Sequence, residues 1–334
     1  MIDFNRIKHA LHRFPESRRR FTRRFFYRKI NVRLRKKQSI TYALKDLDMR
    51  RISTSQTIKL NSSNGYFEVL EHHFVARYSL IERNLLLNSE TGGIYRENGR
   101  KQKEYITESS EWPEEEKLIF DETRPRRVLE LKGKFSRGIT QTGYYHIVTE
   151  ELPQILFLSK FNPTFLQSWR GYGIAEEIYK ILGVKSFKTN RFIRPEELYL
   201  TTRGKDVGYL HPENLNLLKE FKNLVFENSR KKGPEKIYVS RRNSRRSHPA
   251  EKEIQNVYLN KGFHNFDSRG MSIVEQINFF SNCREIAGLH GAGLTNAIWA
   301  NECKLVEFMP QDRINRCFEW QSFLCNHEYQ VNIL

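Results

Sequence analysis

The last third of the chain has the most regular alternation of apolar and polar positions. Four short apolar runs have the length of buried strands, at residues 237–239, 263–266, 286–289 and 305–308. Between them, apolar residues return every three or four positions, which predicts helices at 251–261, 273–283 and 294–299. Strands that alternate with helices of this length form parallel sheets through right-handed crossovers. Such sheets bind ligands at the carboxyl ends of their strands, so the residues that follow each run are the first candidates for a binding site.

The part of the chain before residue 235 has a less regular pattern. Residues 38–135 contain short apolar runs between polar turns, which predict strands but no chemistry. The next stretch predicts a strand from Val128, helices at 144–161 and 174–182, and a strand at 197–201. Apolar residues at helical spacing predict an amphipathic helix at 211–229. Lys231-Lys232-Gly233-Pro234 then breaks the pattern and indicates a domain boundary.

Charge is concentrated at the N-terminus. The chain carries a net charge of +18. Residues 1–37 hold 14 Lys and Arg against Asp3 and Glu16, a net of +12, which leaves +6 for the other 297 residues. Phe14, Phe21 and Phe25 are interleaved with these arginines, as in helices that lie in an anionic membrane interface. The charge therefore predicts a basic amphipathic segment rather than a basic globular surface. The alternative is a solvated basic tail, or a tail that touches nucleic acid non-specifically.

Composition favours a folded intracellular protein. The 334 residues are 38% hydrophobic, which is enough to bury real cores. No stretch approaches the roughly 18 consecutive apolar residues of a membrane-spanning helix, and no secretory signal is visible. The four cysteines form no CxxC pair and have no His at zinc-finger spacing, so we expect reduced thiols. We therefore expect a cytoplasmic protein that binds the inner face of the plasma membrane through residues 1–37.

A glycine-containing segment follows the third apolar run. It reads His290, Gly291, Ala292, Gly293, Leu294, Thr295 and Asn296, directly after the strand and at the start of the next helix. Two glycines allow the backbone to turn sharply and approach a ligand, and the first N–H groups of a helix bind anions. A Gly-x-Gly alone is weak evidence and also fits a plain turn. The position between strand and helix favours an anion site.

An arginine-rich segment follows the first apolar run. Ser240, Arg241 and Arg242 come directly after residues 237–239, and Arg245 and Arg246 lie further on. Guanidinium groups pair with phosphate oxygens bidentately. Because the carboxyl ends of parallel strands share one edge, Arg241 and Arg242 are expected to reach the same diphosphate as the glycine segment. The alternative is a solvated loop, which we expect for Arg245 and Arg246.

Two further positions have acid–base or hydrogen-bonding potential. Glu307 ends the fourth apolar run, where its carboxylate could accept hydrogen bonds from ribose hydroxyls or face solvent. His146 and Glu150 are four apart and so share one helix face. Pro153 has no N–H for the carbonyl of Thr149, which predicts a kink there and a free backbone acceptor. An imidazole paired with a carboxylate can take a proton from a hydroxyl, although a structural His beside a surface Glu has the same spacing.

Together these segments resemble glycosyltransferase family 61, whose bacterial members are also described as capsular-polysaccharide-biosynthesis-type proteins. The family's elements are matched in order by His146…Glu150…Leu152-Pro153, by Tyr238-Val239-Ser240-Arg241-Arg242, by Glu275-Gln276, and by residues 288–296. The resemblance covers about residues 140–310, and the last element is specific. The family often has Asp at the position of Glu150, and Glu151 is the alternative candidate for the base.

The resemblance implies an α/β fold of GT-B type, in which two Rossmann-like domains face a cleft, here with a basic N-terminal extension. It implies an inverting glycosyltransferase that needs neither metal nor cofactor, because side chains and helix dipoles stabilise the departing diphosphate. Glu150, assisted by His146, is then the catalytic base. The residues expected to bind the nucleotide-sugar donor are Arg241, Arg242, His290, Gly291, Ala292, Gly293, Thr295, Asn296 and Glu307.

This resemblance gives each part of the chain an expected role. Residues 1–37 would be the basic segment, 38–230 the acceptor-side domain, 231–310 the nucleotide-sugar-binding domain, and 311–334 a C-terminal helix packing back across the domains. The expected partners are a nucleotide-sugar donor and a glycan or lipid-linked glycan acceptor, in surface polysaccharide (capsule) biosynthesis.

Two alternatives remain open. One is a nucleic-acid-binding protein that uses residues 1–37, although no recognised nucleic-acid module is present and no specific nucleic acid is expected. The other is a GT-B-like protein that binds glycan without catalysis, against which the intact motifs argue.

Overall fold

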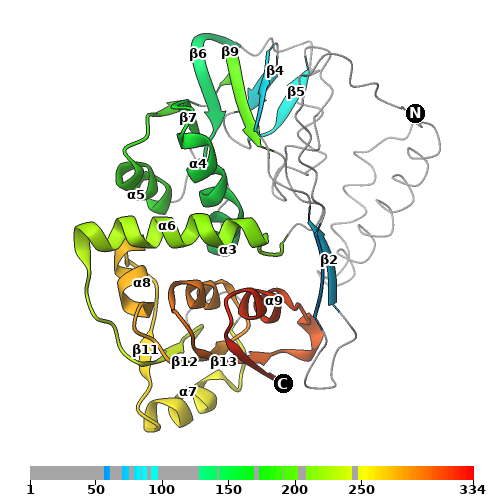
Figure 1. Cartoon of the computed structure of the whole chain (residues 1–334). Coiled ribbons are helices and arrows are strands. Elements are labelled where there is room, and N and C mark those ends of the chain that lie inside the picture. Colours follow the sequence, from blue (N-terminus) through cyan, green and yellow to red (C-terminus); the bar gives the residue numbers. More distant parts are fainter. Residues whose placement is uncertain are drawn as a thin grey trace, which may run out of the picture. The chain divides into compact units, whose positions relative to one another are not determined.

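The computed structural model describes residues 56–60, 70–74, 79–83, 85–88, 92–96, 128–140, 143–168, 173–189, 191–201, 208–242 and 247–334. All of them fall within one compact unit, Ile52–Leu334. The basic segment 1–37 lies outside the described residues, as do Arg245 and Arg246, so the expectations for them stay predictions. The described chain forms two larger β-sheets with connecting helices. It also forms a small ribbon in which β1 (Gln56–Leu60) pairs antiparallel with β2 (Leu70–Phe74) (Figure 1).

The first sheet is mixed. Its described strands are β3 (Ser79–Glu82), β4 (Leu85–Asn88), β5 (Ile94–Arg96), β6 (Leu129–Arg137), β7 (Thr164–Ser168), β8 (Ser186–Thr189) and β9 (Phe192–Thr201). The last four are parallel and lie in the order β8-β7-β6-β9, with β3 and β4 antiparallel to β9 and β5 antiparallel to β4. The parallel part has a Rossmann-like order. The antiparallel strands make the sheet less uniform than the expected Rossmann-like domain.

Helices connect and cover the parallel strands of the first sheet. They are α3 (Tyr144–His146), the π-helical turn η3 (Ile147–Glu151), α4 (Leu152–Ser159), α5 (Gly173–Leu182) and α6 (Pro212–Ser229). The predicted helices at 144–161, 174–182 and 211–229 are therefore confirmed, the first as three consecutive helical pieces. None of the helices in the described parts of the chain is long and apolar enough to cross a membrane.

The second sheet is fully parallel, as the alternating pattern predicts. In the described residues its strand order is β11-β10-β12-β13-β14. The strands are β10 (Lys236–Val239), β11 (His264–Phe266), β12 (Glu285–Leu289), β13 (Lys304–Met309) and β14 (Glu328–Ile333). The connecting helices are α7 (Glu251–Asn260), α8 (Ile273–Phe280), η4 (Ala292–Trp299), η5 (Gln311–Arg313) and α9 (Cys317–Leu324). The helix predicted at 294–299 is confirmed as η4, which is a 3₁₀ helix.

The C-terminal segment 311–334 is more than the expected helix. Only residues 317–324 form α9, and residues 328–333 add β14 to the second sheet. The indole N–H of Trp320 in α9 donates a hydrogen bond of 2.9 Å to the carbonyl of Leu210, which lies between β9 and α6. The helix therefore contacts the earlier part of the chain, while the strand completes the sheet. Strand β14 has only a short period-two pattern, and the helical pattern of α9 just before it makes this pattern hard to recognise in the sequence.

One hydrophobic core joins the two sheets. A single cluster of buried residues contains Leu152 and Phe165 from the first part and Ile237 and Trp299 from the second. Helix α6 contacts both α4 and α8 (Figure 1). The ring of Phe221 in α6 lies 6.4 Å from that of Trp299. The predicted boundary near residue 231 falls between α6 and β10, and the residues on either side of it share this core.

Candidate active site

The strand order of the second sheet indicates where a ligand binds. The chain runs from β10 to its neighbour β11 on one side and then crosses to β12 on the other side. The carboxyl ends of β10 and β12 therefore flank a topological switch point, where open α/β sheets bind ligands. Arg241 follows β10 and His290 follows β12. Topology alone thus brings the arginine and glycine segments to one edge.

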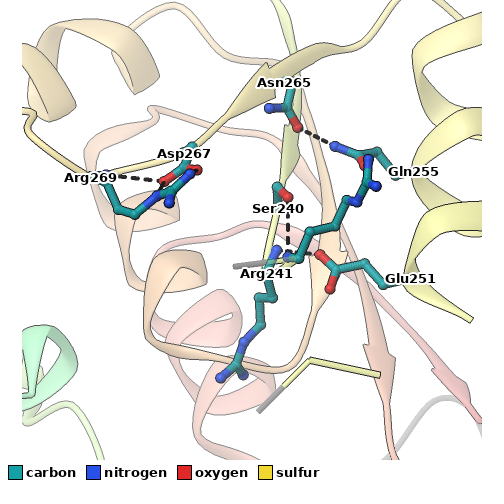
Figure 2. Close-up of polar contacts among 8 residues, drawn as sticks. Ser240, Arg241, Glu251, Gln255, Asn265, Asp267 and Arg269 are labelled. Atoms are coloured by element: carbon teal, nitrogen blue, oxygen red, sulfur yellow. Dashed lines mark hydrogen bonds and ion pairs between the residues drawn. The ribbon is translucent and has the colours of Figure 1, made fainter. Parts of the chain in front are cut away.

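Arg241 connects the two segments directly. Its Nη1 donates a hydrogen bond to the carbonyl oxygen of His290. Its backbone N–H donates to the carboxylate of Glu251, at the start of α7. Figure 2 shows Glu251 beside the backbone of Arg241, with the guanidinium extending away from that carboxylate. The expected proximity of Arg241 and the glycine segment is therefore confirmed, and Glu251 fixes the loop from which Arg241 projects.

The glycines are needed for close packing rather than for an unusual backbone conformation. Gly291 has an extended φ of 170°, which any residue adopts. A Cβ atom added to Gly291 would lie 2.0 Å from Nη1 of Arg241, and one added to Gly293 would lie 2.7 Å from Cγ1 of Val239. The first glycine therefore makes room for the guanidinium, and the second lets η4 pack on β10. The glycines were predicted to let a ligand approach the backbone closely, and in the structure it is Arg241 that approaches the backbone there.

Arg242 points toward other partners. Its side chain is exposed, and its Nη1 lies 3.5 Å from Oε1 of Gln255 in α7. Gln255 in turn donates a 2.6 Å hydrogen bond to Asn265 of β11, as Figure 2 shows. The structure thus brings Arg241, but not Arg242, to the glycine segment. Both remain at the carboxyl edge of the sheet.

His290 forms a pair with Glu307. Its Nδ1 lies 2.5 Å from Oε1 of Glu307, which is on the neighbouring strand β13 opposite Gly288. The hydroxyl of Tyr329 on β14 donates a 2.6 Å hydrogen bond to Oε2 of the same carboxylate. Glu307 has no exposed surface. Glu307 was predicted either to accept hydrogen bonds from ribose or to face solvent. The structure buries Glu307, so it does not face solvent, and the geometry favours an indirect role in which Glu307 holds the imidazole of His290.

The rest of the glycine segment lies in η4. The N–H of Leu294 bonds to the carbonyl of Gly291 at 2.9 Å, so the first turn begins at Ala292. The first N–H groups of a helix have no partner within it and can bind an anion. Thr295 and Asn296 are fully buried. Both were predicted to bind the donor, but in the described structure their side chains are part of the core.

Asn296 connects η4 to the helix that carries His146. Its Oδ1 accepts a 2.6 Å hydrogen bond from the hydroxyl of Tyr144, and its Nδ2 donates to Gln276 at 3.1 Å. The indole of Trp299 lies 3.4 Å from the same Tyr144 hydroxyl. These buried and partly buried bonds hold α3 at a fixed position relative to the glycine segment.

The helix around Pro153 contains a π turn instead of a simple kink. The N–H of Leu152 reaches back five residues to the carbonyl of Ile147. Pro153 has no N–H to donate to the carbonyl of Thr149. That carbonyl accepts a 2.8 Å hydrogen bond from the buried side chain of Asn214 in α6. The predicted free acceptor is therefore wrong. A buried carbonyl without a partner costs about 1–3 kcal/mol, and Asn214 removes that cost.

His146 and Glu150 form the expected pair on this helix. Nδ1 of His146 lies 2.8 Å from Oε1 of Glu150, which also accepts from the backbone N–H of Gly208 at 3.1 Å. The imidazole is 25% exposed and the carboxylate 12%. The more accessible member of the pair is thus the histidine, whose Nε2 lies on the side of the ring away from Glu150.

Glu151 has a different environment from Glu150. It is 2% exposed, and it accepts a 2.8 Å hydrogen bond from the hydroxyl of Thr140. The backbone N–H of Thr140 lies 3.1 and 3.2 Å from its two oxygens. Glu151 therefore anchors the loop after β6, which leaves Glu150 as the better placed of the two carboxylates.

A chain of rings joins the two His–Glu pairs. Tyr145 lies 5.5 Å from the ring of His146 and 5.7 Å from Phe318 of α9, whose ring lies 5.4 Å from His290. Burial, together with Cys317 and Glu150, raises the pKa of Tyr145 well above its ordinary value, so this residue stays a neutral phenol. The two pairs therefore approach the same buried aromatic cluster from opposite parts of the chain.

Several residues of this site were missed in the sequence analysis. Tyr329 and Phe318 lie in the segment expected to be only a helix, and Asn214 and Glu251 sit at helix starts where polar residues are common. An acidic residue ten positions after Arg241 carries no signal by itself. In the described parts of the chain, no group of three or more His, Cys, Asp or Glu side chains could hold a metal ion.

Comparison with known families gives one finding. The family model described as Glycosyltransferase 61 matches residues 144–306. The match begins at Tyr144, includes both arginine and glycine segments, and ends one residue before Glu307. A search of curated proteins found no match for the chain.

Proposed function

We propose that this chain is an inverting glycosyltransferase that takes its sugar from a nucleotide-sugar donor. The match of residues 144–306 to the Glycosyltransferase 61 model supports a transferase of the glycosyltransferase class. The acceptor in this proposal is a hydroxyl of a glycan or lipid-linked glycan. The observation that carries the donor assignment is the bond from Arg241 to the carbonyl of His290 at the switch point of the second sheet.

The diphosphate of the donor binds at this switch point. The guanidinium of Arg241 pairs with phosphate oxygens, and the first N–H groups of η4, at Ala292 and Gly293, donate to them. Arg242, on the same edge, can meet the nucleotide further along the sheet. These groups neutralise the charge of the leaving diphosphate without a metal ion, which is why we propose a metal-independent GT-B enzyme.

The acceptor hydroxyl is deprotonated by the His146–Glu150 pair. Glu150 holds Nδ1 of the imidazole and is tied to Gly208, so Nε2 of His146 is the better placed base. The sequence favours Glu150 in this role, and the geometry supports Glu150 as the group that orients His146. Both residues are then required, with different effects on the rate.

The reaction is a single displacement. The acceptor oxygen forms a bond to the anomeric carbon, its proton moves to His146, and the bond from that carbon to the diphosphate breaks. The electron pair of that bond remains on the diphosphate. Attack from the side opposite the leaving group inverts the configuration. The two His–Glu pairs approach one aromatic cluster, which supports a common reaction centre.

The basic segment 1–37 supports a place for the reaction. Its net charge of +12 and interleaved Phe residues suit an anionic membrane surface, each nearby Lys or Arg contributing about 1 kcal/mol. We place the enzyme in the cytoplasm at the inner face of the plasma membrane, acting on a lipid-linked acceptor in surface polysaccharide biosynthesis. Sedimentation of the chain with anionic but not neutral vesicles, lost on deletion of residues 1–37, tests this part.

A binding screen followed by product analysis tests the central proposal. Thermal shifts of the full chain are measured against UDP-, GDP-, CMP- and dTDP-sugars, because a ligand of the folded state raises its melting temperature. The donor with the largest shift is then supplied with glycan acceptors, and the anomeric configuration of the product is read by NMR. Absence of any shift and any transfer would refute the proposal, and retention of configuration would refute the mechanism.

A further inference from the structure

A chain of hydrogen bonds runs from the C-terminal strand β14 to the imidazole of His290. Tyr329 donates to Oε2 of Glu307 at 2.6 Å, and Oε1 of Glu307 lies 2.5 Å from Nδ1 of His290. The carboxylate has no exposed surface. Among the described residues, each of its oxygens therefore has one hydrogen-bond partner, and the two partners come from different elements.

The direction of these bonds fixes which nitrogen of His290 carries a proton. Burial, with the neighbouring Glu307 charge, raises the pKa of Tyr329 far above its ordinary value, so this phenol stays protonated and donates. A buried ionised carboxylate is stable only when its oxygens accept hydrogen bonds. Nδ1 of His290 therefore donates to Glu307. Nε2, across the ring, is directed away from the carboxylate.

His290 is held from two sides. Its carbonyl oxygen accepts from the guanidinium of Arg241, while its ring is fixed by Glu307 and packs 5.4 Å from Phe318. The side chain is still 14% exposed. The ring thus reaches the surface beside Arg241 and Gly291, where the diphosphate is proposed to bind.

The two residues behind His290 lie outside the matched family domain. The match ends at Val306, and Glu307 and Tyr329 follow it. Strand β14 pairs in parallel with β13 so that Glu307 lies opposite Val331, two residues from Tyr329. The last part of the chain therefore supplies both groups that orient the histidine.

We propose that Glu307 and Tyr329 are positioning residues that direct Nε2 of His290 at the donor's diphosphate. The inference rests on the proposed function. A bound diphosphate favours the form of His290 that also carries a proton on Nε2, and that N–H stabilises the charge developing on the leaving group. His290 keeps its protons throughout and contributes only a hydrogen bond, since the acceptor proton goes to His146.

The test compares diphosphate with monophosphate binding by calorimetry. Full-length wild type, His290→Gln, Glu307→Gln and Tyr329→Phe are titrated with UDP and UMP, or with the GDP or dTDP pair if that nucleotide gives the larger wild-type thermal shift. We expect about tenfold weaker diphosphate binding for Glu307→Gln and about threefold for Tyr329→Phe, as for loss of hydrogen bonds to charged groups. Monophosphate affinity should change less than about twofold, because that ligand lacks the second phosphate.

A double-variant cycle separates positioning from simple structural damage. In the His290→Gln background, Tyr329→Phe should have no further effect on diphosphate affinity or on kcat, because it acts through the missing imidazole. Tyr258→Phe is the matched control, since Tyr258 packs on Phe308 across the same sheet from Glu307. Equal losses from Tyr329→Phe in both backgrounds would overturn the proposal.

The outcomes also separate this inference from the proposed function. If wild type binds no nucleoside diphosphate, the proposed function fails and the inference fails with it. If wild type binds and Tyr329→Phe leaves the preference for diphosphate unchanged, only the positioning role is refuted. Tyr329→Phe keeps the ring and its packing, so it carries the test even if Glu307→Gln does not fold.

Discussion

The two His–Glu pairs have the same bond and different surroundings. In each, Nδ1 of the histidine faces a carboxylate oxygen, at 2.8 Å for His146 with Glu150 and 2.5 Å for His290 with Glu307. Glu150 is 12% exposed and lies in a helical segment four residues after its partner. Glu307 is completely buried, on a strand seventeen residues beyond His290, and has Tyr329 as a second donor.

The difference assigns different chemistry to the two pairs. A carboxylate near solvent allows its histidine to accept a proton and pass it on to water. A sealed carboxylate with a donor on each oxygen holds its histidine ring in one orientation. In the proposed mechanism, the first pair therefore suits proton transfer at the acceptor, and the second suits stabilisation of the leaving group at the donor.

The largest effect is expected from removing His146, the more accessible of the two histidines. His146→Ala should lower kcat by about 10²–10⁴-fold, as for loss of a general base, with unchanged affinity for nucleoside diphosphates. Steady-state kinetics and calorimetry measure the two quantities. His264→Ala, at an exposed position on β11, is the control. A loss of diphosphate affinity equal to the loss of rate would remove the proposed distinction between the pairs.

Glu150→Gln should have the next largest effect on the rate. Gln keeps the size of the side chain but removes the charge that stabilises protonated His146, so we expect a fall in kcat of about 10²-fold. The same kinetics measure it beside His146→Ala. If Glu150→Gln is the more damaging of the two, Glu150 is the base and His146 the assisting group.

Arg241→Ala should act on binding instead of on proton transfer. It removes a charged pair with phosphate, so diphosphate affinity should fall about tenfold or more. Arg242→Ala should cost less, because only Arg241 reaches the glycine segment. Arg284→Ala, exposed at the opposite end of β12, is the control. A larger effect from Arg242 would place the diphosphate nearer α7.

Gly291→Ala should produce a smaller effect of the same kind. The added methyl group would occupy the place of the Arg241 guanidinium, whose flexible end can move. We expect diphosphate affinity to fall about threefold with little change in melting temperature. Gly173→Ala, where an added Cβ meets nothing within 4 Å, is the control. A large loss of stability would show that the segment tolerates no movement.

The smallest effect is expected from removing the charge of a third carboxylate, Glu251. Burial raises the pKa of Glu251 above its ordinary value of 4.5, although hydrogen bonds from Arg241 and its neighbour oppose this. The folded state then binds the proton more tightly, so this group's contribution to stability falls as pH rises from 4.5 through the raised pKa. In urea unfolding across this range, the free energy of unfolding of Glu251→Gln should lose less with rising pH than that of wild type. An unchanged dependence would contradict the raised pKa.

The sequence accounts for the local features of the site. Four strands of the second sheet and the three helices between them follow from apolar periodicity, because burial of both sheet faces leaves continuous apolar runs. The pair His146 and Glu150 follows from a spacing of four within a helix. The motif segments follow strands, and parallel strands end at one edge, so the proximity of Arg241 to His290 could be predicted.

What the sequence could not reveal are contacts that depend on strand order and on helix packing. Tyr329 reaches Glu307 only because β14 pairs with β13. Asn214 donates to the carbonyl of Thr149 only because α6 packs on α4. Arg242 points away from Arg241 because its partner Gln255 lies in α7. Periodicity reports which face of an element is buried and carries no information about its neighbours. The sequence by itself determined the elements and the residue types at their ends, and the tertiary structure decided which of those residues meet.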